Sequence, residues 1–299
     1  MKNLKSLHTA VLEWYKTNAR EFPWRPSRDP YRVLISEMMS QQTQISRVVP
    51  FYTRWLKAFP TFKALASASK AVVLREWSGL GYNSRAIRLH ALARIVTEDH
   101  HGRLPRSVEA LLEFPGIGRY TAHAICCCAF LQNVPVVDVN IGRVLTRIFS
   151  EVSSASEMKP EKESWMLATS ALPSTDVFEW NQGLMDIGAT ICTARSPKCA
   201  LCPVRRYCKS ADAPVFQMPA LKNSAPHKKE PSYNGVPRRL YRGKILKLLH
   251  AGAMTEADVS AKLEHEFGAQ DEEWIRHVLD ELEKSRLIVR RGKKVSIAA

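Results

Sequence analysis

Apolar side chains recur every three to four residues through the first two thirds of the chain, and short polar breaks separate the runs. This spacing is the period of an amphipathic α-helix. It predicts helices over Leu4–Asn18, Pro30–Phe59 with a break at Pro50, Lys63–Ser69, Lys70–Gly79, Ser84–His100, Ser107–Phe114, Arg119–Phe130, Ile141–Phe149, Pro160–Ala171 and Val177–Thr190. Alternating runs of Val, Ile and Thr are almost absent, so we predict that this part of the chain is all-α.

The pattern changes after residue 212. Residues 213–238 are rich in proline and basic side chains, which predicts an extended linker. Residues 239–299 then predict three short helices, over Leu240–Leu249, Glu256–Phe267 and Glu272–Lys284, and an alternating segment typical of a β-hairpin. This is the order of a small winged-helix-like α+β domain. The alternative is a helical cap that packs on the main domain.

Charge divides this C-terminal region further. Its third predicted helix is largely acidic, whereas basic residues gather on the predicted hairpin, at Arg286, Arg290, Arg291, Lys293 and Lys294. We therefore expect the hairpin, rather than the helix, to approach phosphates.

The whole chain of 299 residues carries 44 Lys and Arg against 29 Asp and Glu, a net charge of +15. Such a balance points to nucleic acid or an anionic membrane surface as the partner. No stretch is apolar enough to span a membrane, and the charged N-terminus lacks the cleavage site of a signal peptide. We therefore expect a protein of the reducing cytoplasm, where cysteines remain thiols or metal ligands.

Four cysteines lie within the 17 positions from 192 to 208, at Cys192, Cys199, Cys202 and Cys208. Four soft thiolates are the ligands of an iron–sulfur cluster or a zinc ion. The reducing compartment disfavours two disulfides. Zinc stays a rival, although its tetrathiolate sites often show two Cys-x2-Cys pairs and this chain has one. Three consecutive cysteines at 126–128 point in different directions on a helix and are predicted to be buried apolar residues.

Residues 111–124 predict a helix, a tight turn and a second helix. Gly116 and Gly118 allow the backbone of a sharp turn, and Ile117 lies between them. The N–H groups of such a turn and of the following helix can bind a phosphate oxygen. This is the pattern of a helix-hairpin-helix motif, which grips the DNA backbone without reading sequence. An ordinary turn between two helices is the alternative.

Two carboxylates stand out because apolar residues surround them in sequence. Asp138 follows two valines and precedes a predicted helix, which is also the place of an N-cap aspartate. Glu37 lies in an apolar helical run, where a carboxylate is more often paired or drawn toward solvent than catalytic. The uncharged polar run at 41–44 that follows Glu37 is suited to touching bases.

Several motifs occur in a fixed order. They are Pro-Trp-Arg at 23–25, Ser-Glu-x-Met-x-Gln-Gln-Thr-Gln at 36–44, Gly-Leu-Gly-Tyr at 79–82, the hairpin, Val-Asp-x-Asn-x-x-Arg-Val at 137–144, Asn-Gln-x-Leu-Met-Asp-x-Gly at 181–188 and the four cysteines. With these motifs the chain resembles the adenine-specific mismatch DNA glycosylases, the MutY family, within the helix-hairpin-helix superfamily that includes endonuclease III. The resemblance covers about residues 5–210.

The resemblance implies a fold, a cofactor and a partner. A six-helix barrel domain at 22–132 would contain the helix-hairpin-helix, and residues 1–21 and 133–212 would form an iron–sulfur domain. The four cysteines would hold a [4Fe–4S] cluster, and a monovalent cation is expected at the hairpin turn. The partner would be double-stranded DNA with a mismatch or an oxidised base, bound by a monomer in the cytoplasm near the nucleoid.

The resemblance also implies roles for single residues. Asp138 matches the essential aspartate of the superfamily, and Glu37 matches the carboxylate peculiar to the adenine branch. Glu37, with a raised pKa, would protonate adenine N7, and Asp138 would stabilise the positive charge that grows on the sugar. The base pocket would comprise Trp24, Arg25, Tyr120 and Gln182, and the residues that fill or wedge the duplex would be Gln42 and Tyr82.

Position 120 bears on the reaction product. Bifunctional relatives that also cut the strand carry a lysine here, which attacks the sugar as a Schiff-base nucleophile. This chain has Tyr120. The resemblance therefore implies a monofunctional DNA glycosylase of base excision repair that leaves an abasic site.

The chain departs from the family in three places, one of which is Gly142, where relatives often carry other residues. We find no segment like the domain that recognises 8-oxoguanine in typical members, and Val139 follows Asp138 where a glycine is usual. Whether guanine or 8-oxoguanine stands opposite the adenine is therefore open. A glycosylase for thymine opposite guanine is one alternative, which Glu37 argues against because thymine has no N7. A DNA-binding iron–sulfur regulator without catalysis is the other, and the two carboxylates together argue against it.

Overall fold

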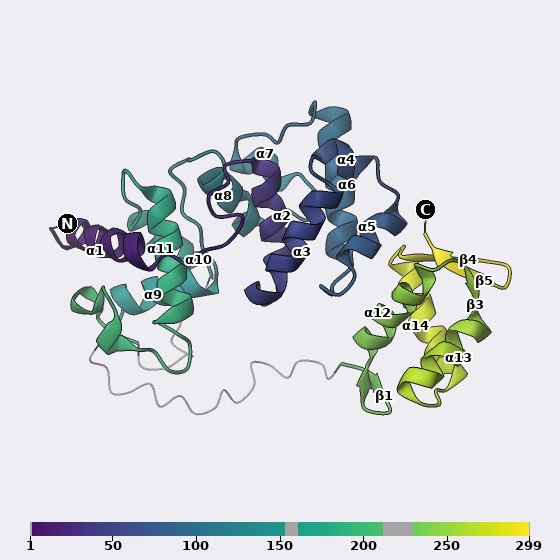
Figure 1. The fold of residues 1–299 in the computed structure, drawn as a ribbon. Coiled ribbons are helices and arrows are strands. Elements are labelled where there is room, and N and C mark those ends of the chain that lie inside the picture. The colour runs from purple at the N-terminus through teal and green to yellow at the C-terminus, as the bar shows by residue number, and fades with distance from the viewer. Residues whose placement is uncertain (1, 153–160, 212–229, 299) are drawn as a thin grey trace. The chain divides into compact units, whose positions relative to one another are not determined.

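The computed structural model describes residues 2–152, 161–211 and 230–298 (Figure 1). The described residues up to 211 form helices joined by loops, as predicted, and the predicted helix start at Pro160 lies outside the described residues. Its helices are α1 (Lys2–Asn18), α2 (Pro30–Ser40), α3 (Ile45–Ala58), α4 (Phe62–Ala66), α5 (Lys70–Trp77), α6 (Ser84–Asp99), α7 (Val108–Leu112), α8 (Arg119–Cys128), α9 (Val139–Phe149), α10 (Glu161–Ser170) and α11 (Val177–Thr190). Within the described ranges, none of the helices combines the length and the apolar character needed to cross a membrane.

The break between α2 and α3 lies at residues 41–44, and the predicted break at Pro50 is wrong. Pro50 lies inside α3, where it removes one backbone hydrogen-bond donor. The side chains of Tyr52 and Trp55 on the apolar side of α3 are buried, and their packing keeps the helix continuous. Gln42 instead has a φ of 53°, which an α-helix cannot continue. The polar run after Glu37 is therefore a turn with a left-handed residue in it.

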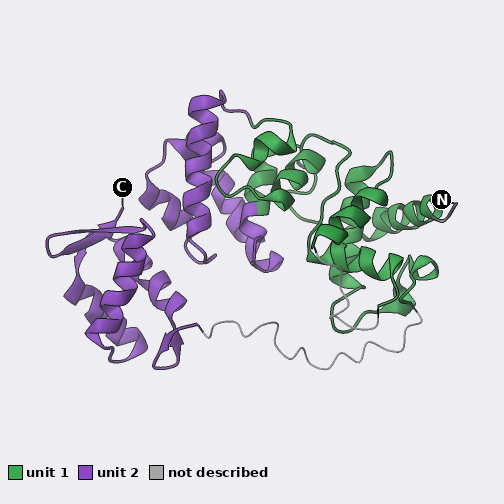
Figure 2. Ribbon diagram, turned by 180° about the vertical axis from the view of Figure 1, so that it is seen from behind, with its two compact units in different colours: residues 1–37, 104–222 green, residues 38–103, 223–299 purple. Residues whose placement is uncertain are grey.

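The chain divides into two compact units (Figure 2). The first comprises residues 1–37 and 104–222, and the second comprises residues 38–103 and 223–299. This grouping cuts the chain at other positions than the predicted barrel and iron–sulfur domains do. Those domain boundaries stay a prediction.

The first unit has an apolar core formed by α1, α9, α10 and α11. Trp165 and Trp180 are buried in it. Gly183 lets α11 approach α1 closely, since a Cβ at this position would lie 2.8 Å from Val11 Cγ1. The core fixes two places that carry chemistry: the N-terminus of α9, next to Asp138, and the C-terminus of α11, where the cysteine loop begins.

In the second unit, α6 packs against α4 and α5, and α5 packs against α3. The rings of Trp55 and Trp77 meet edge to face with their centroids 5.4 Å apart, and both side chains are fully buried. The turn between α5 and α6 carries Tyr82. A rigid helical base therefore supports this turn.

Residues 230–298 form helices with short strands. In order they are β1 (Ser232–Tyr233), β2 (Val236–Pro237), α12 (Arg238–Leu249), β3 (Met254–Thr255), α13 (Glu256–Phe267), α14 (Glu272–Lys284), β4 (Ile288–Arg291) and β5 (Lys294–Ile297). The last three strands form an antiparallel sheet in the order β3-β5-β4. From α12 onward this is the element order of a winged helix, and it contains one strand, β3, that the sequence pattern did not reveal.

Two predictions for this region need correction. Residues 213–229 of the predicted linker lie outside the described residues, and residues 230–237 contain the β1–β2 hairpin. Arg290 is not available at the tip of the β4–β5 hairpin, because it forms ion pairs with three carboxylates, those of Glu256, Asp280 and Glu283. The exposed basic residues at this tip are Arg291, Lys293 and Lys294.

Candidate functional site

Asp138 caps the N-terminus of α9. Its Oδ1 accepts hydrogen bonds from the backbone N–H groups of Asn140 (3.0 Å) and Ile141 (2.7 Å), and its Oδ2 accepts one from the Asn140 side chain (2.7 Å). The N-cap interpretation is therefore correct, and it is compatible with catalysis. Helix N-termini favour negative charge, so the helix keeps an anionic acceptor in one position.

Glu37 on α2 is electrostatically coupled to Tyr120 and Asp138. The phenol of Tyr120 donates a hydrogen bond to the Glu37 carboxyl group. Burial of this group, helped by the negative charge of Asp138, raises the pKa of Glu37 from 4.5 to about 7, against the opposing effect of the hydrogen bond. Glu37 can therefore carry a proton near neutral pH, beside a second carboxylate that accepts three hydrogen bonds.

Tyr120 lies in the first turn of α8. Burial raises the pKa of its phenol well above the usual value, and the charges of Glu37 and Asp138 add to the shift. The phenol therefore stays neutral and acts as a hydrogen-bond donor. These interactions place Tyr120 near Glu37 and Asp138, while its role in a base pocket stays a prediction.

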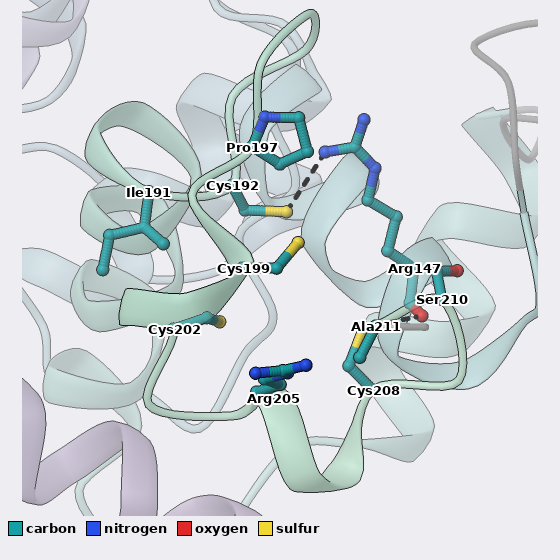
Figure 3. A pocket seen from close by; sticks show the side chains of 10 residues that line it. All are labelled: Arg147, Ile191, Cys192, Pro197, Cys199, Cys202, Arg205, Cys208, Ser210 and Ala211. Atoms are coloured by element: carbon teal, nitrogen blue, oxygen red, sulfur yellow. Dashed lines mark hydrogen bonds between the residues drawn. The ribbon is translucent and has the colours of Figure 1, made fainter. Parts of the chain in front are cut away.

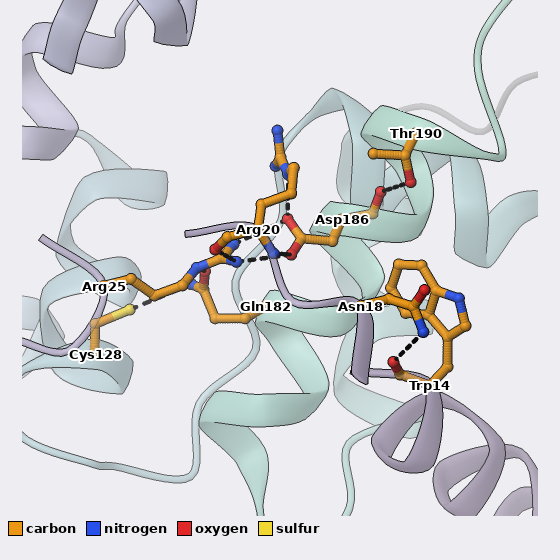
Figure 4. A network of polar contacts seen from close by, with 8 residues as sticks. All are labelled: Trp14, Asn18, Arg20, Arg25, Cys128, Gln182, Asp186 and Thr190. Carbon is orange, nitrogen blue, oxygen red and sulfur yellow. Dashed lines mark hydrogen bonds and ion pairs between the residues drawn. The ribbon is translucent and has the colours of Figure 1, made fainter. Parts of the chain in front are cut away.

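Arg25 and Gln182 belong to one polar network around the fully buried Asp186 (Figure 4). Arg25 donates to both Asp186 oxygens, at 2.7 and 2.9 Å, and to Gln182 Oε1 at 3.1 Å. Burial alone would raise the pKa of Asp186, but the hydrogen bonds from Arg25 and Arg20 outweigh it and lower that pKa. The Arg25 side chain is 11% exposed and orients Gln182, and its place in the base pocket stays a prediction.

The three consecutive cysteines are buried, as predicted. All three also have polar neighbours: Cys126 Sγ donates to the Arg106 carbonyl at 3.6 Å, Cys127 Sγ lies 3.4 Å from Asn181 Nδ2, and Cys128 Sγ lies 3.7 Å from Gln182 Nε2. The hydrogen bond with Cys127 and burial raise the pKa of Cys128, and the charge of Glu37 contributes to the same shift. Cys128 is therefore in contact with Gln182 and within electrostatic range of Glu37.

The predicted helix-hairpin-helix consists of α7, a turn and α8. Gly116 has a φ of 88°, which favours glycine, and Ile117 is buried beneath the turn. Gly118 is the N-cap of α8, where no side chain caps the helix and an added Cβ would meet nothing within 4 Å. The start of α8 is therefore open to an approaching phosphate.

Gln42 and Tyr82 belong to the second unit, whereas the carboxylates belong to the first. Both have a left-handed backbone, with φ of 53° and 48°, and both are exposed, Tyr82 by 60%. Arg85, which the sequence pattern did not single out, is buried and donates to the carbonyls of Gln41 and Gly81, one in each turn. Trp24 lies in the first unit and stacks on Phe22, with ring centroids 5.1 Å apart.

The four cysteines of the loop line one cavity (Figure 3), and its wall is completed by Arg147, Ile191, Pro197, Arg205, Ser210 and Ala211. Arg147 Nη1 lies 3.3 Å from Cys192 Sγ and can donate to it. Burial raises the pKa of Cys202 and of Cys208 to about 11, so these thiols keep their protons until a metal binds them as thiolates. A cavity ringed by four sulfurs suits either an iron–sulfur cluster or a tetrathiolate zinc ion.

Asn140 and Arg143 connect this loop with Asp138. Arg143 donates to the Cys192 carbonyl (2.8 Å), the Gly188 carbonyl (2.7 Å) and Asn140 Oδ1 (2.8 Å). Gly188 lets α11 lie close to the start of α9, since a Cβ added at Gly188 would lie 2.8 Å from Asn140 Cβ. From sequence, Asn140 and Arg143 counted only as members of a motif, and their spacing of three residues on one helix was the available signal.

Two family models match the chain. Residues 35–169 match the HhH-GPD superfamily base excision DNA repair protein model. Residues 192–208 match the iron–sulfur binding domain of endonuclease III, and this match contains all four cysteines of the loop. The prediction of a [4Fe–4S] cluster is thereby confirmed, and zinc is no longer needed as an alternative.

Relatives with the name adenine DNA glycosylase are similar over most of the chain. That of Mycobacterium tuberculosis (strain ATCC 25618 / H37Rv) is 39% identical over 248 residues, which cover 81% of this chain and 78% of the relative. That of Homo sapiens is 40% identical over 210 residues, which cover 67% of this chain and 38% of the relative.

Two solved structures have a similar fold. A thermostable thymine-DNA glycosylase aligns with a TM-score of 0.65 and 34% identity, over 70% of this chain and 97% of its own. Endonuclease III, in a trapped covalent intermediate with DNA, aligns with a TM-score of 0.60 over 70% of this chain and 96% of its own. The second is 20% identical, so it supports the fold alone.

Proposed function

The chain belongs to the adenine DNA glycosylase family of the HhH-GPD superfamily, and from this premise we propose that it removes adenine that is mispaired in duplex DNA. The base opposite would be guanine or 8-oxoguanine. The observation that carries the proposal is the pair of unlike carboxylates. Glu37 has a pKa of about 7, and Asp138 nearby accepts three hydrogen bonds.

The proposed reaction is hydrolysis of the bond between adenine N9 and the sugar C1′. The base first leaves the helical stack. Glu37 gives its proton to N7, the C1′–N9 bond breaks with its electron pair going to the base, and positive charge remains on the sugar. The Asp138 carboxylate stabilises that charge. Water adds to C1′ and loses a proton, which restores protonated Glu37.

Tyr120, Gln182 and Trp24 would surround the extruded base. Tyr120 orients the Glu37 carboxyl group, and Arg25 orients Gln182. Because Tyr120 occupies the place of a nucleophilic lysine, no covalent amine adduct forms with the sugar. The product would be an abasic site in an unbroken strand.

The remaining predicted residues would bind the cofactor and the duplex. Cys192, Cys199, Cys202 and Cys208 would ligate the cluster, whose bonds tie the loop into one shape. Gly116, Ile117 and Gly118, with a monovalent cation at their turn, would bind a phosphate, and Gln42 and Tyr82 would enter the stack. We propose a monomer that works on cytoplasmic DNA near the nucleoid, and we keep 22–132 and 1–21 with 133–212 as its functional domains.

The test is base release from duplexes that contain adenine opposite 8-oxoguanine, adenine opposite guanine, or thymine opposite guanine. We expect release from the adenine duplexes, with strand breakage only after alkali. Strand breakage without alkali would contradict the role given to Tyr120. Release from none of the duplexes, with binding retained, would leave a DNA-binding regulator.

One observation favours a second candidate, a thymine glycosylase: the solved thymine-DNA glycosylase is 34% identical to this chain. Glu37 favours adenine, because protonation at N7 has no counterpart in thymine. Release of thymine, without release of adenine, would replace the first proposal by the second.

A further inference from the structure

Arg85, in the first turn of α6, is 5% exposed and donates to acceptors in two separate turns. Its Nη2 reaches Thr43 Oγ1 at 3.1 Å and the Gly81 carbonyl at 3.2 Å. Its Nη1 donates at 2.9, 3.0 and 2.6 Å to three carbonyls, those of Met38, Met39 and Gln41. A single side chain thus joins the end of α2 and the 41–44 turn to the turn that precedes α6.

Both turns contain backbone that needs support. Gln42 and Tyr82 have φ of 53° and 48°. A left-handed backbone at a residue other than glycine costs about 1–3 kcal/mol and persists only where the surroundings enforce it. Gly79 and Gly81, with φ of 106° and 78°, shape the second turn. The hydrogen bonds from Arg85 provide the enforcement on both sides.

Arginine suits this position chemically. The last carbonyls of α2 have no partner within their own helix and lie at its negative end, which favours a cation. The guanidinium offers donors in a planar fork, and it lies 5.2 Å from the centroid of the Trp77 ring and 5.5 Å from that of Tyr82. A lysine could not bind both turns in this geometry.

We propose that Arg85 is a positioning residue that fixes the Gln42 and Tyr82 turns relative to each other, so that both side chains insert into the duplex as one rigid wedge. The inference rests on the proposed function and adds to it a residue that need not touch the base or the sugar. Extrusion of a base costs a few kcal/mol. If the two turns were not held together, ordering their side chains during insertion would add a cost of similar size. Loss of Arg85 therefore slows extrusion and leaves the carboxylates intact.

The experiment compares Arg85→Met with Arg88→Met, which removes the same charge from an exposed position on α6. Extrusion is followed by the fluorescence of 2-aminopurine at the target position, and base release is measured in single turnovers at saturating enzyme. We expect Arg85→Met to slow both by about 10- to 100-fold, as for one lost hydrogen bond to a charged group. Arg88→Met should change them by less than about twofold.

A double-mutant cycle separates positioning from general support of the fold. In a Gln42→Ala/Tyr82→Ala background the wedge is already gone, so Arg85→Met should cause no further loss of extrusion or release. If the losses multiply instead, Arg85 acts on the fold as a whole and the inference is overturned. Unchanged extrusion in folded Arg85→Met protein overturns it as well.

A milder variant keeps the test decisive if Arg85→Met does not fold. Thr43→Val removes one acceptor of Arg85 and should slow extrusion by a few fold, with the same lack of further effect in the background without the wedge. Normal extrusion by Thr43→Val would then count against the inference. If the parental protein extrudes 2-aminopurine but releases no adenine, the proposed function fails. The double-mutant cycle measured on extrusion would still test the role of Arg85.

Discussion

The region up to residue 211 and the C-terminal region at 230–298 differ in the surroundings of several of their arginines. In the first, Arg25 and Arg85 are largely withdrawn from solvent and Arg143 is half-buried, and all three donate to carboxylates or carbonyls near the site. In the second, arginines pair with acidic groups nearer the surface, as Arg242 does with Glu281. A net charge of +15 therefore does not by itself locate a DNA-binding surface.

The difference concerns the kind of effect that a substitution produces. Salt weakens the interactions of buried groups little, because these groups act through short, fixed contacts. Exposed charges interact over longer distances, and dissolved ions screen those interactions. At the β4–β5 tip, Arg291, Lys293 and Lys294 form no ion pair within the part of the chain that the structure describes. Changes at the buried groups of the first region should therefore be large and independent of salt, and changes at the tip small and salt-dependent.

Glu37→Gln should have the largest effect. It keeps the size of the side chain and loses the proton donor, so base release should slow by about 10³-fold, within the usual range for general acid catalysis. The parental rate should fall as the pH rises through about 7, where Glu37 loses its proton, and the variant should lack this fall. Single-turnover rates across this interval provide the measurement. A parental rate that stays constant would remove Glu37 as the acid.

Asp138→Asn should slow release by about 10²–10³-fold, because the charge that stabilises the sugar is lost. Asparagine caps a helix about as well as aspartate, so thermal unfolding should change little. Asp271→Asn makes the same change at the N-cap of α14, which accepts from Glu273 N–H, and should affect neither property. Equal rates in Asp138→Asn and parental protein would reduce Asp138 to a cap.

The pKa of Glu37 also links stability to pH. Its folded value of about 7 is raised above the ordinary 4.5, so between these values the folded protein binds more protons than the unfolded chain. This contribution is complete below pH 4.5 and is lost as the pH rises to about 7. The loss is at most about 3 kcal/mol. Glu37→Gln removes this dependence, and thermal unfolding at several pH values should show a shallower decline than in the parental protein; parallel curves would contradict the pKa.

Gly188→Ala should place a Cβ 2.8 Å from Asn140 Cβ and displace the start of α9. We expect a loss of about 1–3 kcal/mol in the free energy of unfolding and base release slowed by about tenfold. Gly183 lies on α11 like Gly188, and Gly183→Ala would place a Cβ 2.8 Å from Val11 Cγ1 on α1. It should destabilise similarly with little change in rate, and equal slowing by both variants would show that α11 acts as a whole.

The smallest effect should come from Lys293→Gln/Lys294→Gln. Duplex binding should weaken, and its dependence on salt should become shallower by about one unit for each phosphate that the tip no longer binds. Release at saturating enzyme should be unchanged. Lys262→Gln/Arg276→Gln removes the same charge from exposed positions on α13 and α14. If this control changes the salt dependence as much as the tip does, the hairpin has no special role.

The sequence was sufficient where a function belongs to contiguous residues. The cysteine loop, the Gly116–Gly118 turn and the capping by Asp138 each depend on their own short stretch of backbone, so spacing alone indicated them. Contacts between distant residues leave no such periodic trace. Arg85 binds Met38 across 47 positions and Arg143 binds Cys192 across 49, and neither link could be read from spacing. Pro50 misled for a related reason, because tertiary burial keeps α3 intact through it.

The double duty of Asp138 has a consequence beyond the single molecule. Under the proposed function, an asparagine at this position would stop base release and leave a protein that still folds and still binds mispairs, because the oxygens proposed to face the sugar also cap α9. In a cell with both forms, the inactive copy would occupy mispairs and shield them from repair. The substitution would then behave as a dominant mutator, and extra copies of the normal gene would relieve it by competition.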